Sequence, residues 1–191
     1  MNLVKFLPVI LLLVTACKSN EHEGQSYTAF TGATLIDGSG SEPVKDAVLL
    51  IKKGRVVATG TKQDVTIPDG ATVVDVSGKT IVPGFINGHG HVGDTKGIEG
   101  GHYSRENIID NLSVYARYGI TTVVSLGGDK EEAEPLRAVN DTTATQRAHL
   151  FIAGEVVNGK TPAEAIEAVE RNHRMGVDVM KIPVLDRKSV V

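Results

Sequence analysis

The chain of 191 residues has no tryptophan, one cysteine and few aromatic residues. The single cysteine, Cys17, excludes an internal disulfide, so the fold depends on its hydrophobic core. The net charge is -3 and no dense lysine–arginine cluster occurs, which excludes nucleic acid as an expected partner. The apolar stretch at residues 6–15 is too short for a membrane-spanning helix, which needs about 20 residues. The remaining composition, with 41% hydrophobic and 23% charged residues, is typical of a globular protein.

The N-terminal segment has the features of a secretory precursor. A positively charged start precedes the apolar stretch, and residues 14–17 (VTAC) resemble a bacterial lipoprotein cleavage box. Residues 1–17 are therefore predicted to be a lipoprotein signal peptide, with Cys17 lipidated and membrane-anchored after cleavage. The alternative is an ordinary signal peptide with a chance cysteine. The polar residues 18–26 are predicted to be a tether, and Lys18 after the cysteine predicts an outer-membrane location facing the periplasm.

Residues 27–83 are predicted to be all-β. The runs at 47–51 and 55–59 are rich in Val, Ile and Leu, and Gly54 between them suits a tight hairpin turn. Two further strands are expected at residues 71–76 and 80–82.

The rest of the chain alternates between predicted strands and helices. Strands are expected at residues 85–87, 121–126, 148–153 and 177–184. Helices are expected at residues 105–118, 135–140 and 162–175. Ser104 and Thr161 are suitable N-caps, and Ile166, Val169 and His173 form a stripe expected to pack on the sheet. Repeated strand–helix units predict an α/β architecture with a parallel sheet.

Two histidines, His89 and His91, follow the strand expected at residues 85–87 and are separated by one glycine. Residues i and i+2 of a strand point to the same face, so the two imidazoles would lie side by side. The small residues Gly88 and Gly90 leave room for a metal ion and its other ligands. The alternative is a polar strand end whose histidines bind water.

Three stretches together resemble the start of the amidohydrolase superfamily of metal-dependent hydrolases. They are residues 35–38 (LIDG), 73–79 (VVDVSGK) and 82–91 (VPGFINGHGH). The resemblance runs from Thr28 onward and is greatest to the imidazolonepropionase-like and prolidase-like members. Asn87 departs from the pattern, because many members have an aspartate there, but that residue is not usually a metal ligand.

The resemblance implies a TIM-like (β/α)8 barrel preceded by a small β-sandwich, of which residues 27–83 would be a portion. A closed barrel takes about 250 residues. Residues 84–191 provide roughly half of that length, enough for barrel strands one to four. The chain is therefore expected to be the N-terminal half of a barrel enzyme and apparently truncated.

The resemblance also implies the metal ligands. His89 and His91 would bind a divalent metal, expected to be zinc as one or two ions, with iron, manganese, nickel and cobalt left open. Lys181 would bridge two ions as a carbamate, because burial and nearby cations favour the neutral amine that reacts with carbon dioxide. The alternative is that Lys181 extends into solvent from a strand end.

The implied reaction is hydrolysis of a C–N bond in an amide, a cyclic amide or a dipeptide by metal-activated water. The alternative is a non-catalytic truncated remnant or a binding lipoprotein; the oligomeric state is left open. The remaining histidines are not expected to be ligands: His22, His102, His149 and His173. Of the acids that follow strand ends (Asp94, Asp129 and Glu155), Asp129 is expected to belong to a solvated helix start.

Overall fold

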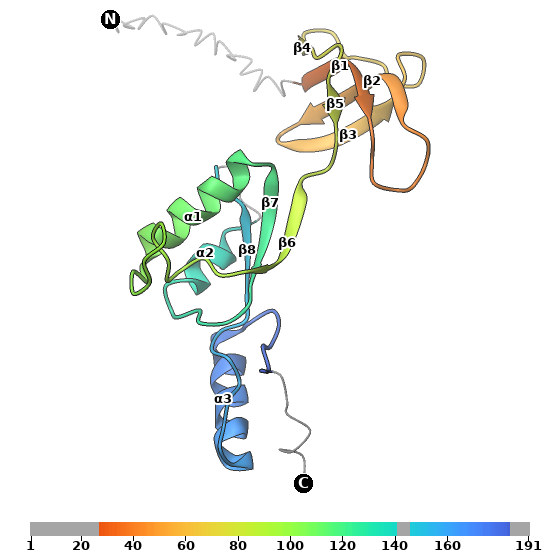
Figure 1. The fold of residues 1–191 in the computed structure, drawn as a ribbon. Coiled ribbons are helices and arrows are strands. Elements are labelled where there is room, and N and C mark those ends of the chain that lie inside the picture. Colours follow the sequence, from red (N-terminus) through yellow and green to blue (C-terminus); the bar gives the residue numbers. More distant parts are fainter. Residues whose placement is uncertain (1–26, 141–145, 184–191) are drawn as a thin grey trace, which may run out of the picture.

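The computed structural model describes residues 27–140 and 146–183 (Figure 1). The predictions for residues 1–26, including Cys17, and for residues 184–191 lie outside this description. No helix in the described ranges is long and apolar enough to cross a membrane. Two sheets follow each other along the chain, an all-β unit first and an α/β unit second (Figure 1).

The first sheet has five strands, in the order β3-β2-β1-β4, with β5 paired to β1. Their bounds are β1 (Tyr27–Leu35), β2 (Val44–Lys52), β3 (Arg55–Gly60), β4 (Thr72–Asp75) and β5 (Thr80–Ile81). Lys53 and Gly54 have positive φ values of 49° and 71° at the hairpin between β2 and β3, as the glycine there predicted. These strands form one sheet, so a complete β-sandwich stays a prediction.

The second sheet is parallel, in the order β6-β7-β8, and confirms the α/β class. Its elements are β6 (Phe85–Gly90), α1 (Arg105–Arg117), β7 (Ile120–Ser125), α2 (Glu134–Ala138), β8 (His149–Ile152) and α3 (Pro162–Met175). The carboxyl ends of the three strands are aligned at Gly90, Ser125 and Ile152. One core joins α1, α2 and the sheet, and includes Ile108, Leu112, Val123, Leu136 and Leu150.

The helix boundaries follow the predicted capping residues. The Ser104 side chain accepts a hydrogen bond from the N–H of Asn107, and the Thr161 side chain accepts one from Glu164. Gly176 ends α3 in the left-handed conformation, with φ of 68°. These helices therefore begin and end where local side-chain chemistry satisfies their free backbone groups.

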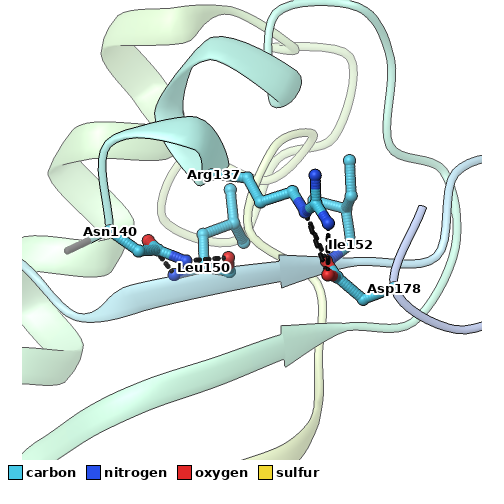
Figure 2. Close-up of polar contacts among 5 residues, drawn as sticks. All are labelled: Arg137, Asn140, Leu150, Ile152 and Asp178. Atoms are coloured by element: carbon cyan, nitrogen blue, oxygen red, sulfur yellow. Dashed lines mark hydrogen bonds and ion pairs between the residues drawn. The ribbon is translucent and has the colours of Figure 1, made fainter. Parts of the chain in front are cut away.

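The predicted strand at residues 177–184 is wrong as far as Pro183, because that segment has no strand conformation. The N–H groups of Asp178 and Val179 both approach one carbonyl oxygen, that of Ile152, at 2.9 and 3.4 Å. The Asp178 carboxylate accepts the Ile152 N–H at 2.9 Å, in place of a backbone carbonyl (Figure 2). The parallel sheet has three strands among the described residues, and the (β/α)8 barrel stays a prediction.

The predicted packing face of α3 is also wrong. Ile166 and Val169 are 59% and 37% exposed, and His173 is exposed beside them. The buried face instead contains Asn172, which accepts the Glu155 N–H at 3.0 Å and donates to the Glu155 carbonyl at 2.8 Å. A buried amide without partners costs about 1–3 kcal/mol, so these two bonds make the burial of Asn172 possible.

Candidate metal centre

His89, His91 and Lys181 lie together at the carboxyl end of the parallel sheet. His89 belongs to β6 and His91 follows it directly. Their ring centroids are 5.5 Å apart. The Nε2 atom of His89 lies 3.5 Å from Nζ of Lys181, although the two residues are far apart in sequence. The fold therefore brings together the three side chains that the sequence suggested as ligands.

The backbone around His89 is fixed by packing and by one amide side chain. Asn87 Oδ1 accepts the His89 N–H at 3.0 Å, and Asn87 Nδ2 donates to the Tyr115 hydroxyl of α1 at 3.3 Å. Gly90 is buried, and a Cβ atom there would meet Val123 of β7 at 2.6 Å. The glycine between the histidines thus lets β6 lie close to β7, while Asn87 ties β6 to α1.

His91 is oriented by the loop that follows β7. Its Nδ1 atom lies 3.1 Å from the carbonyl oxygen of Gly127. When Nδ1 carries the proton and donates to this carbonyl, Nε2 remains free to bind a metal. Gly127 has φ of 100°, and a Cβ atom there would meet Val156 at 2.6 Å and Lys181 at 3.6 Å. Glycine at this position therefore leaves room for the lysine stem while its carbonyl reaches His91.

Asp129, in this same loop, is buried, so its predicted place in a solvated helix start is wrong. It is 5% exposed. Its carboxylate accepts from the Ser125 hydroxyl at 2.5 Å and from the N–H groups of Ala153 and Gly154 at 3.0 and 3.2 Å. Burial raises the pKa of the Asp129 carboxyl, against the opposing effect of these hydrogen bonds and of His91. The side chain joins the ends of β7 and β8 next to the loop that orients His91.

Two asparagines of α1 hold the loop that follows His91. Asn107 Nδ2 donates to the carbonyls of Gly93 and Thr95 at 2.8 and 3.0 Å. Asn111 Nδ2 donates to the same Thr95 carbonyl at 3.0 Å. Asparagine favours caps and turns over helix interiors. Two of them four residues apart inside a predicted helix are therefore a sequence signal for this anchoring role, which the predicted site did not include.

Tyr103 connects the same loop to the one after β7. Its hydroxyl accepts the Lys130 N–H at 2.6 Å, and the Lys130 ammonium lies 4.8 Å from the ring centroid. Burial raises the pKa of Tyr103 to about 12. The ring occupies the space where a side chain at Gly93 would project. Both loops around the histidines are thus fixed to the sheet and to each other.

The other histidines that the structure describes lie away from this centre. His102 lies in an exposed loop, His149 begins β8 and His173 is on the exposed face of α3. The prediction for His22 lies outside the described residues. Among the residues that the structure describes, no group of three His, Cys, Asp or Glu side chains is arranged to hold a metal.

The three side chains fit a divalent metal in part. Two nitrogen ligands of a tetrahedral zinc, each at about 2.1 Å, lie about 3.4 Å apart. The 3.5 Å between His89 Nε2 and Lys181 Nζ is close to that separation, which suits a neutral lysine amine as a direct ligand, whereas a carbamate would bind through its oxygens. The lysine can contribute only after it loses its proton or becomes a carbamate, because an ammonium has no free electron pair.

No family model matches the chain. A dihydroorotase from Clostridium acetobutylicum is 28% identical over 134 residues, which cover 68% of this chain and 30% of that protein. An enamidase from Eubacterium barkeri is 27% identical over 132 residues, which cover 65% of this chain and 33% of that protein. The chain thus spans about a third of the length of these curated relatives.

A solved structure of a Xaa-Pro dipeptidase with bound methionine in its active site has a similar fold. The TM-score is 0.64 at 22% sequence identity, and the match covers 82% of this chain and 47% of that chain. Both units of the described structure therefore have a counterpart in a solved protein, and at this identity the likeness concerns the fold alone.

Proposed function

We propose that this chain, a relative of the amidohydrolase superfamily of metal-dependent hydrolases, supplies a metal-binding part of an enzyme that hydrolyses C–N bonds. The dihydroorotase and enamidase relatives confirm the superfamily resemblance carried by the sequence motifs. The observation that carries the proposal is the convergence of His89, His91 and Lys181 at the carboxyl end of the sheet. Active sites of barrel enzymes lie at this end.

Each of the two histidines has a support that prepares it for its role. His89 would bind through Nε2, with its backbone held by Asn87. His91 would bind through Nε2, because Nδ1 donates to the Gly127 carbonyl. Lys181 would act as a carbamate, whose oxygens can bridge two ions. A bound zinc ion would lower the pKa of water towards about 7 and polarise the scissile carbonyl.

The substrate class is an amide, a cyclic amide or a dipeptide. The dihydroorotase and the enamidase have names that denote hydrolysis of C–N bonds, which supports this class. Histidine and carbamate ligands favour one or two zinc ions among the divalent metals. Activity and substrate are proposed for the whole protein, because the chain spans about a third of its relatives.

Zinc binding to the chain tests the candidate centre. Replacement of His89 or His91 with alanine is expected to raise the dissociation constant for zinc at least about tenfold, which is about 1.4 kcal/mol for the loss of one ligand. Equilibrium dialysis with metal analysis measures it. His173→Ala is the matched control, because that histidine is exposed on α3. Equal zinc affinity in the wild type and both ligand variants would contradict the proposal. Zinc binding without hydrolysis of any of the three substrate classes by the whole protein would favour the non-catalytic alternative.

We further propose that Cys17 carries a lipid anchor at the outer membrane. The cleavage-box resemblance at residues 14–17 supports it, and Lys18 supports the outer-membrane location. Cys17→Ser is expected to release the protein into the soluble fraction or to leave the precursor unprocessed, as fractionation and immunoblotting would show. Lys18→Asp, the control, is expected to stay membrane-bound. Unchanged processing and partitioning of Cys17→Ser would rule out the anchor.

A further inference from the structure

The outer edge of β8, on the side away from β7, is bound by side chains from two directions (Figure 2). Asn140 accepts the N–H of Leu150 at 2.9 Å and donates to its carbonyl at 2.6 Å. At Ile152 the Asp178 carboxylate accepts the N–H, and the Asp178 backbone N–H donates to the carbonyl, both at 2.9 Å. Edge groups that a neighbouring strand would otherwise satisfy are therefore paired.

The Asp178 carboxylate is held in turn by Arg137 of α2. The Nε atom of Arg137 lies 2.9 and 2.8 Å from the two carboxylate oxygens, and Nη2 lies 2.7 Å from one of them (Figure 2). Such a bidentate pair fixes orientation as well as distance. The Asp178 side chain is 17% exposed, so its geometry is restrained on most sides. Asp178 thereby joins α2, the end of β8 and the segment that follows α3.

Lys181 follows Asp178 by three residues on a segment that has no regular structure. Three residues span at most about 10 Å, so the position of Asp178 limits where the Lys181 backbone can lie. The Lys181 carbonyl accepts the Val157 N–H at 2.8 Å, which gives the segment a second attachment. With the segment attached at both points, Nζ of Lys181 lies 3.5 Å from Nε2 of His89.

We propose that the Arg137–Asp178 pair, bound to Ile152, is a positioning element that holds residues 178–181 against β8 and so places the Lys181 amine beside His89. Neither Arg137 nor Asp178 touches the histidines; both act through the backbone that carries the lysine. The meaning of this placement for catalysis rests on the proposed function. The placement itself is a property of the metal-free chain and is measured without metal.

Chemical cross-linking measures the placement directly. A short difluorodinitrobenzene reagent joins a neutral amine to an imidazole only when the two lie within a few ångströms. Each nitrogen forms a bond to a ring carbon, and one fluoride ion and one proton leave for each bond formed. The yield of the His89–Lys181 link, measured by mass spectrometry of peptides from the metal-free chain, reports the effective concentration of one group at the other. Lys181→Ala identifies the product, because the link must disappear in that variant.

Asp178→Ala is expected to lower the yield of this link by about tenfold, and Arg137→Ala by a smaller factor, because the lysine loses its effective concentration at His89. Asn140→Ala is the matched control: it opens the same edge at Leu150 but touches nothing near Lys181. Its link yield is expected to stay at the wild-type level, while amide hydrogen exchange of Leu150 accelerates.

A wild-type yield in Asp178→Ala, together with faster amide exchange at Ile152, would overturn the positioning role. If circular dichroism shows that Asp178→Ala does not fold, the test passes to Arg137→Ala. A wild-type yield of the His89–Lys181 link in Arg137→Ala would then overturn the positioning role. No link in the wild type would overturn the His89–Lys181 contact itself. Loss of the link in Asp178→Ala in a chain that binds no zinc would support the positioning element and contradict only the metal centre.

Discussion

Replacing Asp129 with alanine is expected to lower the free energy of unfolding by about 3–5 kcal/mol. The variant leaves two buried donors without an acceptor, the Ser125 hydroxyl and the Gly154 N–H, while the Ala153 N–H keeps only the Ser125 carbonyl, at 3.0 Å. Each such group costs about 1–3 kcal/mol when it stays buried and unpaired. Urea unfolding followed by circular dichroism measures the change.

Asp129→Asn is the matched control for this prediction. The asparagine has the same shape, its oxygen can accept from Ala153 and Gly154, and its amino group can donate to Ser125. We expect a loss within about 1 kcal/mol at neutral pH, because the hydrogen bonds persist. Equal losses in the alanine and asparagine variants would contradict the view that these hydrogen bonds stabilise the sheet ends.

The difference in stability between Asp129→Asn and the wild type is expected to depend on pH. Burial raises the pKa of the Asp129 carboxyl in the folded state above its ordinary value of 3.8. A raised pKa means that the folded state favours the protonated carboxyl. The contribution of Asp129 to the free energy of unfolding is therefore fully present below the pKa of the unfolded state, and it is lost as the pH rises through the pKa of the folded state. The stability of Asp129→Asn relative to the wild type should therefore increase as the pH rises above 3.8 and through the raised pKa of the folded state. A constant difference over this range would contradict the burial argument.

Local chemistry made the helix ends and the hairpin predictable. Ser104 and Thr161 have hydroxyl groups that satisfy backbone donors within three residues of themselves. Gly54 and Gly176 take positive φ at the positions where the chain must turn. Each of these effects depends on neighbours in the sequence, so the sequence alone was sufficient.

Long-range contacts explain what could not be predicted. The apolar residues after Val177 have strand character, but at the edge of β8 the Asp178 side chain has taken the Ile152 N–H. Asp129 stands in a charged run, and its burial depends on Ala153 and Gly154, which only the pairing of β7 with β8 brings near. Neither contact leaves a periodic trace in the sequence.

The residues of the candidate metal centre also differ in whether a local pattern in the sequence predicts them. His89 and His91 are visible as a motif because a strand places alternate residues on one face. Lys181 could be named only through the family resemblance, since no local pattern connects it to His89. The Arg137–Asp178 pair that precedes it was invisible for the same reason: it joins α2 to a segment beyond α3.

The second large effect is expected at Gly154, two residues after the end of β8. Gly154 has φ of 69°, and a Cβ atom there would overlap the side-chain oxygen of Asn172 and come within 2.9 Å of Val177. Asn172 cannot move aside without losing its two hydrogen bonds to the Glu155 backbone. Gly154→Ala is therefore expected to lower the free energy of unfolding by about 3–5 kcal/mol, as the sum of backbone strain, overlap and a broken buried amide pair.

Gly128→Ala separates backbone strain from overlap. Gly128 also has positive φ, of 81°, but nothing lies within 4 Å of a Cβ atom there. Its replacement is expected to cost only about 1–2 kcal/mol, the strain of a left-handed alanine. Urea unfolding of both variants gives the difference, and hydrogen exchange should show faster exchange in α3 for Gly154→Ala alone. Equal losses at the two glycines would mean that Asn172 yields freely, so that its hydrogen bonds to Glu155 do not hold α3 against the end of β8.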